Sequence, residues 1–493
     1  MVTGHPEALP GQVPSNPSTE NVLSRGGTVV MNVDSSSPVE SVKVLMVPAD
    51  TYVNTVMAPV FPGPGRQITQ MEESRVGHSV TSVKGGKVVI SGGTFFPDAT
   101  SAWDSINGLA TDKFVSQIVI YDASEGTFST KVCCQITGSQ PGFMSGSNCR
   151  ESLGTAVSET QCVSAGLVAD YPKLITSRAL HQAVELSDGR VAFLGGISPS
   201  VDTTTLELVA ATEIYDPSTN TVAQGPPLMY PRAAFTATPI PNSPDKFLVV
   251  GGMGANSIQT WEIWSPFAGS TQSGALLAGR MRHTATASPS QGKIFVVGGE
   301  NDTDISPGFE VFDSSTFTFY PTLYPMTGTT SRTMHTAAFV EQHGFVYLIG
   351  GFQDKDHTLM LSQVDVIQVN ACTSMDCTGS FVSPPGFSLK TKRAGHISLV
   401  LDENRVLIAG GVNVSTDGDP NPIAAGEIIY ERIVETNGQK KREVAFGETA
   451  PMPTGRFFHA GTFLETGHAL IVGGAAPSGA TYVGQVDGLL YNP

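Results

Sequence analysis

The sequence predicts an all-β fold in which seven four-stranded antiparallel blades form one closed ring, a seven-bladed β-propeller. Glycine is abundant, at 53 of 493 residues, and charged residues make up only 15%. Such a composition disfavours disordered chains, coiled coils and helical solenoids. A Gly-Gly doublet ends an apolar run seven times. After the first interval, the doublets recur every 47 to 63 residues, the length expected for a blade of four short strands.

Each doublet closes a strand-like apolar piece, for example residues 247–250 or 346–349. Glycine permits a positive φ and a close approach between backbones, so we expect the doublets where neighbouring strands converge. The seven doublets are Gly92-Gly93, Gly195-Gly196, Gly251-Gly252, Gly298-Gly299, Gly350-Gly351, Gly410-Gly411 and Gly473-Gly474.

An Arg-x-x-His or Arg-x-x-Phe motif starts 17 to 19 residues before every doublet. Because that span holds two strands and a turn, the arginine is expected on the same rim as the doublet. Its five donors can satisfy carbonyls or carboxylates between blades, so we predict a structural role for these arginines and blade packing for the histidines. The arginines are Arg75, Arg178, Arg232, Arg280, Arg332, Arg393 and Arg456.

A third strand follows most doublets and ends in an aromatic residue and often Asp, as in residues 213–216 and 310–313. A variable fourth strand then leads to the next arginine. With these motifs, the sequence resembles the kelch-repeat family over residues 75–493. The resemblance implies a propeller of the wider galactose-oxidase and kelch superfamily, without the residues of its copper site.

Copper radical enzymes of that superfamily place a tyrosine directly before the histidine of the motif. Here the matching positions read Phe458-His459, Met334-His335 and Gly395-His396, so the tyrosine is missing. The sialic-acid epimerase type of propeller has six blades, whereas the repeat count here is seven. The sequence also lacks a P-loop, a nucleophile elbow and a His-Glu-x-x-His motif. We therefore predict no catalytic residue, no metal centre and no cofactor.

Residues 1–20 are predicted to form a flexible tail, and residues 21–493 a single propeller. The last blade supplies only three strands after its arginine, so a strand within residues 41–58 is expected to complete it and close the ring. The first interval between doublets, at 103 residues, predicts an insertion at about 127–177.

The six cysteines are predicted to form three disulfides. Cys372 and Cys377 would close a small loop in blade five. The other four lie in the insertion, where their pairing stays open: Cys133, Cys134, Cys149 and Cys162. Paired cysteines are typical of an oxidising compartment, so we expect a mature extracellular, periplasmic or cell-surface protein whose leader is absent from this sequence.

The charge balance and the hydropathy exclude two classes of partner. The net charge is −16 and the pI is about 5.0, which disfavours binding to nucleic acid. No apolar run approaches the ~18 residues of a membrane-spanning segment.

Acidic residues cluster in the loops between second and third strands, which propeller topology places on one face. We predict this face to bind a basic or cation-bridged partner. Its candidates are Glu300, Asp302, Asp304, Asp354 and Asp356. Asp417 and Asp419 form a fragment of a calcium loop without a closing bidentate Glu, so a solvated loop is the preferred interpretation.

These observations favour a non-enzymatic binding or scaffold propeller of an exported or cell-surface protein, with a protein or glycan partner. Two alternatives stay open. One is an extracellular enzyme on the same fold, a carbohydrate oxidase or a sugar epimerase, and the other is a subunit of a surface assembly.

Overall fold

The computed structural model describes residues 2–4, 24–27, 45–48, 51–54 and 71–493, the last range without 72, 96–112, 125, 130–131, 137–141, 145–153, 158–171, 201, 203–204, 255–258, 327–330, 374, 415–419, 437–438 and 479–480. Most of the predicted tail and insertion therefore lies outside the described residues, as do Asp417, Asp419, Cys149 and Cys162. The domain boundaries given above stay predictions.

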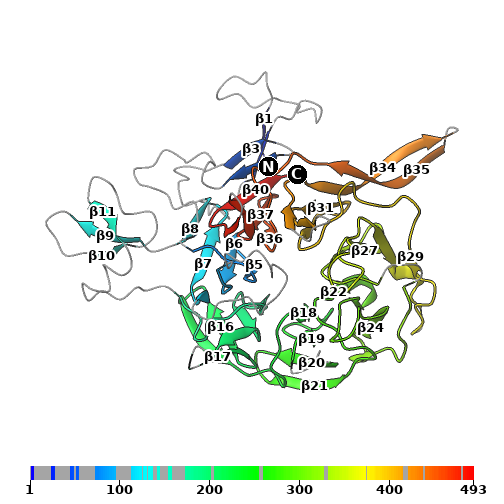
Figure 1. The fold of residues 1–493 in the computed structure, drawn as a ribbon, viewed down its shortest axis with the longest axis horizontal. Coiled ribbons are helices and arrows are strands. Elements are labelled where there is room, and N and C mark those ends of the chain that lie inside the picture. Colours follow the sequence, from blue (N-terminus) through cyan, green and yellow to red (C-terminus); the bar gives the residue numbers. More distant parts are fainter. Residues whose placement is uncertain are drawn as a thin grey trace, which may run out of the picture.

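Seven four-stranded antiparallel sheets are arranged as a ring, which confirms the predicted seven-bladed propeller (Figure 1). Blades one to three comprise β5 (Ser79–Val83), β6 (Lys87–Ser91), β7 (Ile118–Asp122) and β8 (Thr127–Ser129); β12 (Gln182–Glu185), β13 (Val191–Leu194), β16 (Thr212–Asp216) and β17 (Thr221–Gly225); and β18 (Thr236–Pro239), β19 (Phe247–Val250), β20 (Thr260–Ser265) and β21 (Gly269–Ala275).

Blades four to seven repeat the same strand order. They comprise β22 (Thr284–Ser288), β23 (Lys293–Val297), β24 (Phe309–Asp313) and β25 (Thr318–Phe319); β26 (Thr336–Val340), β27 (Phe345–Ile349), β28 (Val364–Gln368) and β29 (Phe381–Val382); β30 (Ile397–Asp402), β31 (Arg405–Ala409), β34 (Glu427–Thr436) and β35 (Gln439–Glu448); and β36 (Ala460–Phe463), β37 (Ala469–Val472), β40 (Gly488–Asn492) and β4 (Thr51–Asn54).

The N-terminal strand β4 closes the ring, as the sequence predicts. It pairs antiparallel with β40 of blade seven, and Tyr52 faces Tyr491 with ring centroids 4.8 Å apart. The first strands of successive blades contact one another all the way round, including β36 with β5. Blade seven therefore has four strands like the other blades, with β4 as its outermost strand.

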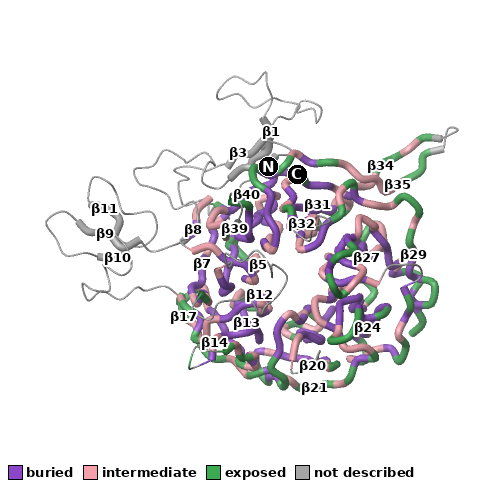
Figure 2. The backbone as a smooth tube through the Cα atoms, in the orientation of Figure 1, coloured by how far each residue is buried: buried purple, intermediate pink, exposed green. Residues whose placement is uncertain are grey.

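The core lies between the blades rather than at the centre of the ring (Figure 2). Second strands such as β19 are buried along their whole length, because neighbouring blades cover both of their faces, and this explains their unbroken apolar sequences. Outer strands such as β17 are largely exposed. Apolar clusters join adjacent blades, for instance Trp264 of blade three with Leu194 of blade two.

Shorter elements decorate the ring. Small hairpins follow three doublets: β14 (Ile197–Pro199) with β15 (Leu206–Leu208), β32 (Val412–Val414) with β33 (Pro420–Pro422), and β38 (Ala475–Ser478) with β39 (Thr481–Gly484). Two further sheets are β1 (Val2–Gly4), β2 (Ser24–Gly27) and β3 (Leu45–Pro48), and β9 (Val132–Ile136), β10 (Gly142–Met144) and β11 (Gly154–Val157). The 3₁₀ turns that lie wholly within the described residues include η4 (Pro289–Gln291) and η5 (Val369–Ala371).

Cys372 and Cys377 form a disulfide after β28, which closes a loop of blade five. Cys133 and Cys134 belong to β9, but their side chains are outside the described part. Across the residues that are described, no helix is long and apolar enough to cross a membrane.

Blade six differs from the others because its outer hairpin is long. Strands β34 and β35 pair through ten residues each, from Glu427–Glu448 to Thr436–Gln439. The neighbouring strand β31 pairs with β34 only as far as Tyr430. The remaining part is a two-stranded ribbon that extends beyond the ring (Figure 1).

Candidate functional site

The motif arginines and the doublets meet on one face of the ring. In every blade the residue after the arginine bridges the residue after the doublet, as Ala233 does with Met253. The guanidinium also reaches the first glycine of its own doublet: Arg232 Nη1 donates to the Gly251 carbonyl at 2.7 Å. The arginine carbonyl in turn accepts the N–H of the second glycine of the preceding blade. The same three contacts recur around the ring and form the seam between blades.

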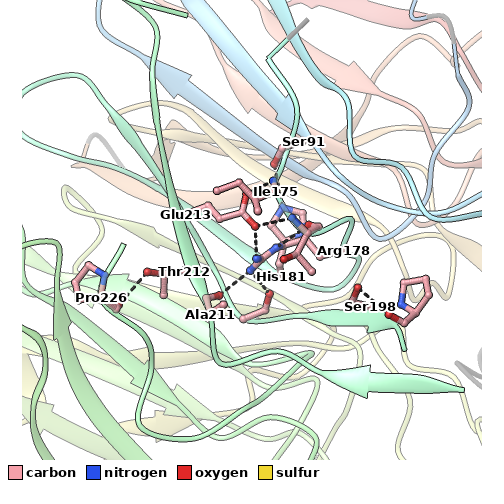
Figure 3. A network of polar contacts seen from close by, with 12 residues as sticks. Ser91, Ile175, Arg178, His181, Ser198, Ala211, Thr212, Glu213 and Pro226 are labelled. Atoms are coloured by element: carbon pink, nitrogen blue, oxygen red, sulfur yellow. Dashed lines mark hydrogen bonds and ion pairs between the residues drawn. The ribbon is translucent and has the colours of Figure 1, made fainter. Parts of the chain in front are cut away.

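Each of six arginines is ion-paired with a carboxylate at the start of its blade's third strand. In Figure 3, Arg178 meets Glu213, with Nη2 and Oε1 2.5 Å apart and both side chains buried. The same carboxylate accepts the backbone N–H groups of Ile175 and Thr176 at 2.6 and 3.0 Å. The other pairs are Arg232–Glu262, Arg280–Glu310, Arg332–Asp365, Arg393–Glu427 and Arg456–Asp487.

Blade one departs from this pattern, because Gln117 replaces the carboxylate and contacts Arg75. Sequence reasoning did not identify these partners. The available signal was the acidic residue that opens third-strand pieces such as 213–216 and 310–313. Because the guanidinium groups are buried and paired with the blades' own groups, the ring of arginines does not present an anion-binding surface.

The motif histidines pack against the preceding blade. A Cβ atom on Gly298 would lie 2.9 Å from His335 Cε1 and would collide with the Arg332 carbonyl oxygen, so only glycine fits there. His335 Nε2 shares a hydrogen bond with the Thr284 hydroxyl at 3.0 Å. Burial, with a smaller contribution from the charge of Arg332, holds the pKa of His335 well below its usual value. The imidazole of His335 is therefore neutral at physiological pH.

The residues two positions after each arginine precede the first strands of the blades and form an inner circle, which we call the mouth of the ring. All seven adopt a left-handed backbone conformation, although five are not glycine. The N–H groups of the five non-glycine residues donate to the carbonyl of the equivalent residue of the preceding blade, as Leu180 does to Gly77 at 2.8 Å. These half-buried positions are Gly77, Leu180, Ala234, Arg282, Met334, Gly395 and Phe458.

One polar cluster adjoins this mouth. Arg282 Nη1 lies 2.8 Å from Glu300 Oε1, and His357 Nε2 lies 3.1 Å from Glu300 Oε2. Although burial acts to raise it, the pKa of Glu300 is lowered by the hydrogen bond from His357 and the charge of Arg282. Glu300 is therefore a buried, paired group that ties the loops of blades four and five together.

The remaining acidic candidates occupy the same two loops. Asp302, Asp304 and Asp356 are exposed. Asp354 is half-buried, and its carboxylate accepts the N–H groups of Thr358 and Leu359. Acidic residues of the same loop thus differ in their exposure and in their hydrogen bonds.

No metal site emerges from the described residues, since none of them form a cluster of three or more His, Cys, Asp or Glu side chains that could hold an ion. In the comparisons with known proteins, neither a family model nor a curated protein matches the chain.

Proposed function

We propose that the chain is a kelch-type propeller of an exported or cell-surface protein that acts as a non-enzymatic binding or scaffold module for a protein or glycan partner. The composition of the mouth of the ring carries this proposal. Copper radical relatives place a catalytic tyrosine at the position that is Met334, Gly395 or Phe458 here. A mouth built of aliphatic and aromatic side chains and one arginine offers contact area for recognition.

The histidines and arginines of the repeat support the same proposal, because both are engaged in the seam. His335 contacts the preceding blade's Thr284, and Arg332 is paired with Asp365. Variable loops on a rigid frame suit recognition. The disulfide between Cys372 and Cys377 favours an oxidising compartment.

One observation favours a subunit of a surface assembly as the second candidate. Two-stranded ribbons are marginally stable in isolation, yet the ribbon at the end of β34 and β35 extends away from the ring. Its exposed side chains include Ile433, Arg432, Lys441 and Arg442. A neighbouring subunit that covers this ribbon would explain its length.

The enzymatic alternative is tested by loading the purified protein with Cu²⁺, removing excess metal and measuring bound copper by mass spectrometry together with peroxide release from sugars and aldehydes. We expect neither stoichiometric copper nor turnover. Stoichiometric copper with turnover would refute the proposal. A glycan array and a panel of purified extracellular proteins then give the positive test, and we expect saturable binding that substitution of Met334 or Leu180 by Lys weakens. Binding that these substitutions leave unchanged would contradict a site at the mouth.

A further inference from the structure

A polar pocket opens on blade five, on the face that carries the doublets. Its volume is about 510 Å³, within the range of small-molecule sites. One wall is the loop between β27 and β28, and the other is the segment that leads from β29 to Arg393. The polar lining residues are Gln353, Thr358, Ser362, Ser383, Ser388 and Lys392, together with Gln363.

Both walls are fixed by the protein itself. Asp354 accepts the N–H of Leu359 at 2.7 Å, and the N–H of Gln353 donates to the Leu359 carbonyl at 2.8 Å. The two walls are joined by the N–H of Leu389, which donates to the Ser362 carbonyl at 2.8 Å. A ligand that enters this pocket therefore does not have to order the loops, which would otherwise reduce its affinity.

The described lining of the pocket carries one charge, which is positive. Among these lining residues Lys392 is the only charged side chain; it is exposed, and it makes no ion pair with the described part of the chain. Its neighbour Lys390 differs, because its ammonium group is paired with Glu448. In a chain of net charge −16, an unpaired lysine beside a pocket attracts an anionic group to that point.

The rest of the lining selects the kind of anion. Hydroxyl and amide groups, such as those of Ser362 and Gln353, exchange hydrogen bonds with sugar hydroxyls. Leu359, which is 58% exposed, offers an aliphatic surface to the C–H face of a sugar ring. Nucleobases are held by stacking on aromatic side chains, and the described lining contains none. We propose that this pocket binds a short oligosaccharide that carries a carboxylate or sulfate group, a proposal that rests on the binding role inferred above.

Isothermal titration of the full chain with three probes tests the proposal: a trigalacturonate, a sulfated trisaccharide and the uncharged maltotriose. We expect at least one acidic probe to bind, with an affinity that falls as salt is raised, and maltotriose to bind more weakly. Lys392→Met should reduce the affinity for the acidic probe at least tenfold, and Gln353→Leu should reduce it for any probe that binds. Preference for the carboxylate or the sulfate probe identifies the natural anion.

Lys390→Met is the matched control, because it removes a neighbouring positive charge outside the pocket and should leave the affinity unchanged. Equal losses in Lys390→Met and Lys392→Met, or no binding of either acidic probe at millimolar concentration, would overturn the pocket assignment. Such a failure leaves the binding role itself intact if array partners still bind. Copper-dependent turnover would instead refute the binding role, whatever the titration shows.

Discussion

The seam histidines predict an unusually steep loss of stability in mild acid. Six blades place a histidine against the preceding blade, at His78, His181, His283, His335, His396 and His459. Burial, together with the charge of the adjacent arginine, lowers the pKa of His283 to about 3, and the same causes lower that of His335 well below 6.5. In the unfolded chain these groups titrate near pH 6.5.

The direction and the magnitude of the pH effect on stability follow from this difference in pKa between the folded and unfolded chain. Between pH 3 and 6.5 the unfolded chain binds more protons than the folded ring, so the free energy of unfolding falls as the pH falls. Below about pH 6, each histidine contributes a loss of about 1.4 kcal/mol per pH unit, and six together contribute roughly 8 kcal/mol per unit. Since a typical domain is stable by about 5 to 15 kcal/mol, the ring should lose most of its stability between pH 6 and pH 4.5.

Scanning calorimetry from pH 8 to pH 4.5 measures this effect through the shift of Tm with pH and the unfolding enthalpy, which together give the proton uptake. We expect the six histidines to take up about six protons on unfolding near pH 5. Phe235 occupies the equivalent place in blade three, so the matched variant is His335→Phe, which should fold and take up one proton fewer. A Tm that stays constant between pH 7 and pH 5, or an unchanged uptake in that variant, would refute the reasoning.

Three further outcomes are expected. Glu310→Leu leaves the buried Arg280 charge unpaired and should cost about 3 to 5 kcal/mol, whereas Glu465→Leu, at an exposed turn, should cost less than about 0.5 kcal/mol in urea unfolding. Gly298→Ala should lower stability by about 2 to 5 kcal/mol, because the added Cβ atom strains the backbone and collides with the next blade. Gly467→Ala is the control: Gly467 has a positive φ but no neighbour within 4 Å, so it should lose only the strain of about 1 to 2 kcal/mol. Equal losses in the two variants would contradict the collision. Replacing residues 432–443 by a two-residue turn should leave Tm within about 2 °C, and a larger drop would show that the ribbon supports blade six.

The blade count could be predicted from the sequence because the doublet is a physical requirement. A side chain at Gly251 would collide with the Arg280 carbonyl oxygen of the next blade, so the position accepts only glycine and the pattern is visible in every repeat. Closure by an N-terminal strand was predictable for a related reason, since a blade with three strands needs a fourth. Both predictions depend on backbone requirements that leave a visible pattern in the sequence.

The contacts of the candidate functional site join residues that lie far apart in the sequence, so local sequence patterns do not reveal them. The side chain that meets the arginine is the carboxylate of Glu262 in blade three and of Asp365 in blade five, but the amide of Gln117 in blade one, at varying distances along the chain. Glu300 was grouped with the loop aspartates, yet it is buried and paired with Arg282 and His357. The polar pocket combines two segments about thirty residues apart, so its lining became apparent only in three dimensions.

The pairing of β4 with β40 makes the order of synthesis matter. Tyr52 leaves the ribosome long before its partner Tyr491. Six blades can form in the interval, and the pairing of β4 with β40 then closes a loop that contains all of them. Until β40 has been made, the nascent ring stays open and its unpaired strand edges can pair wrongly. Chains interrupted before β40 therefore cannot close the ring.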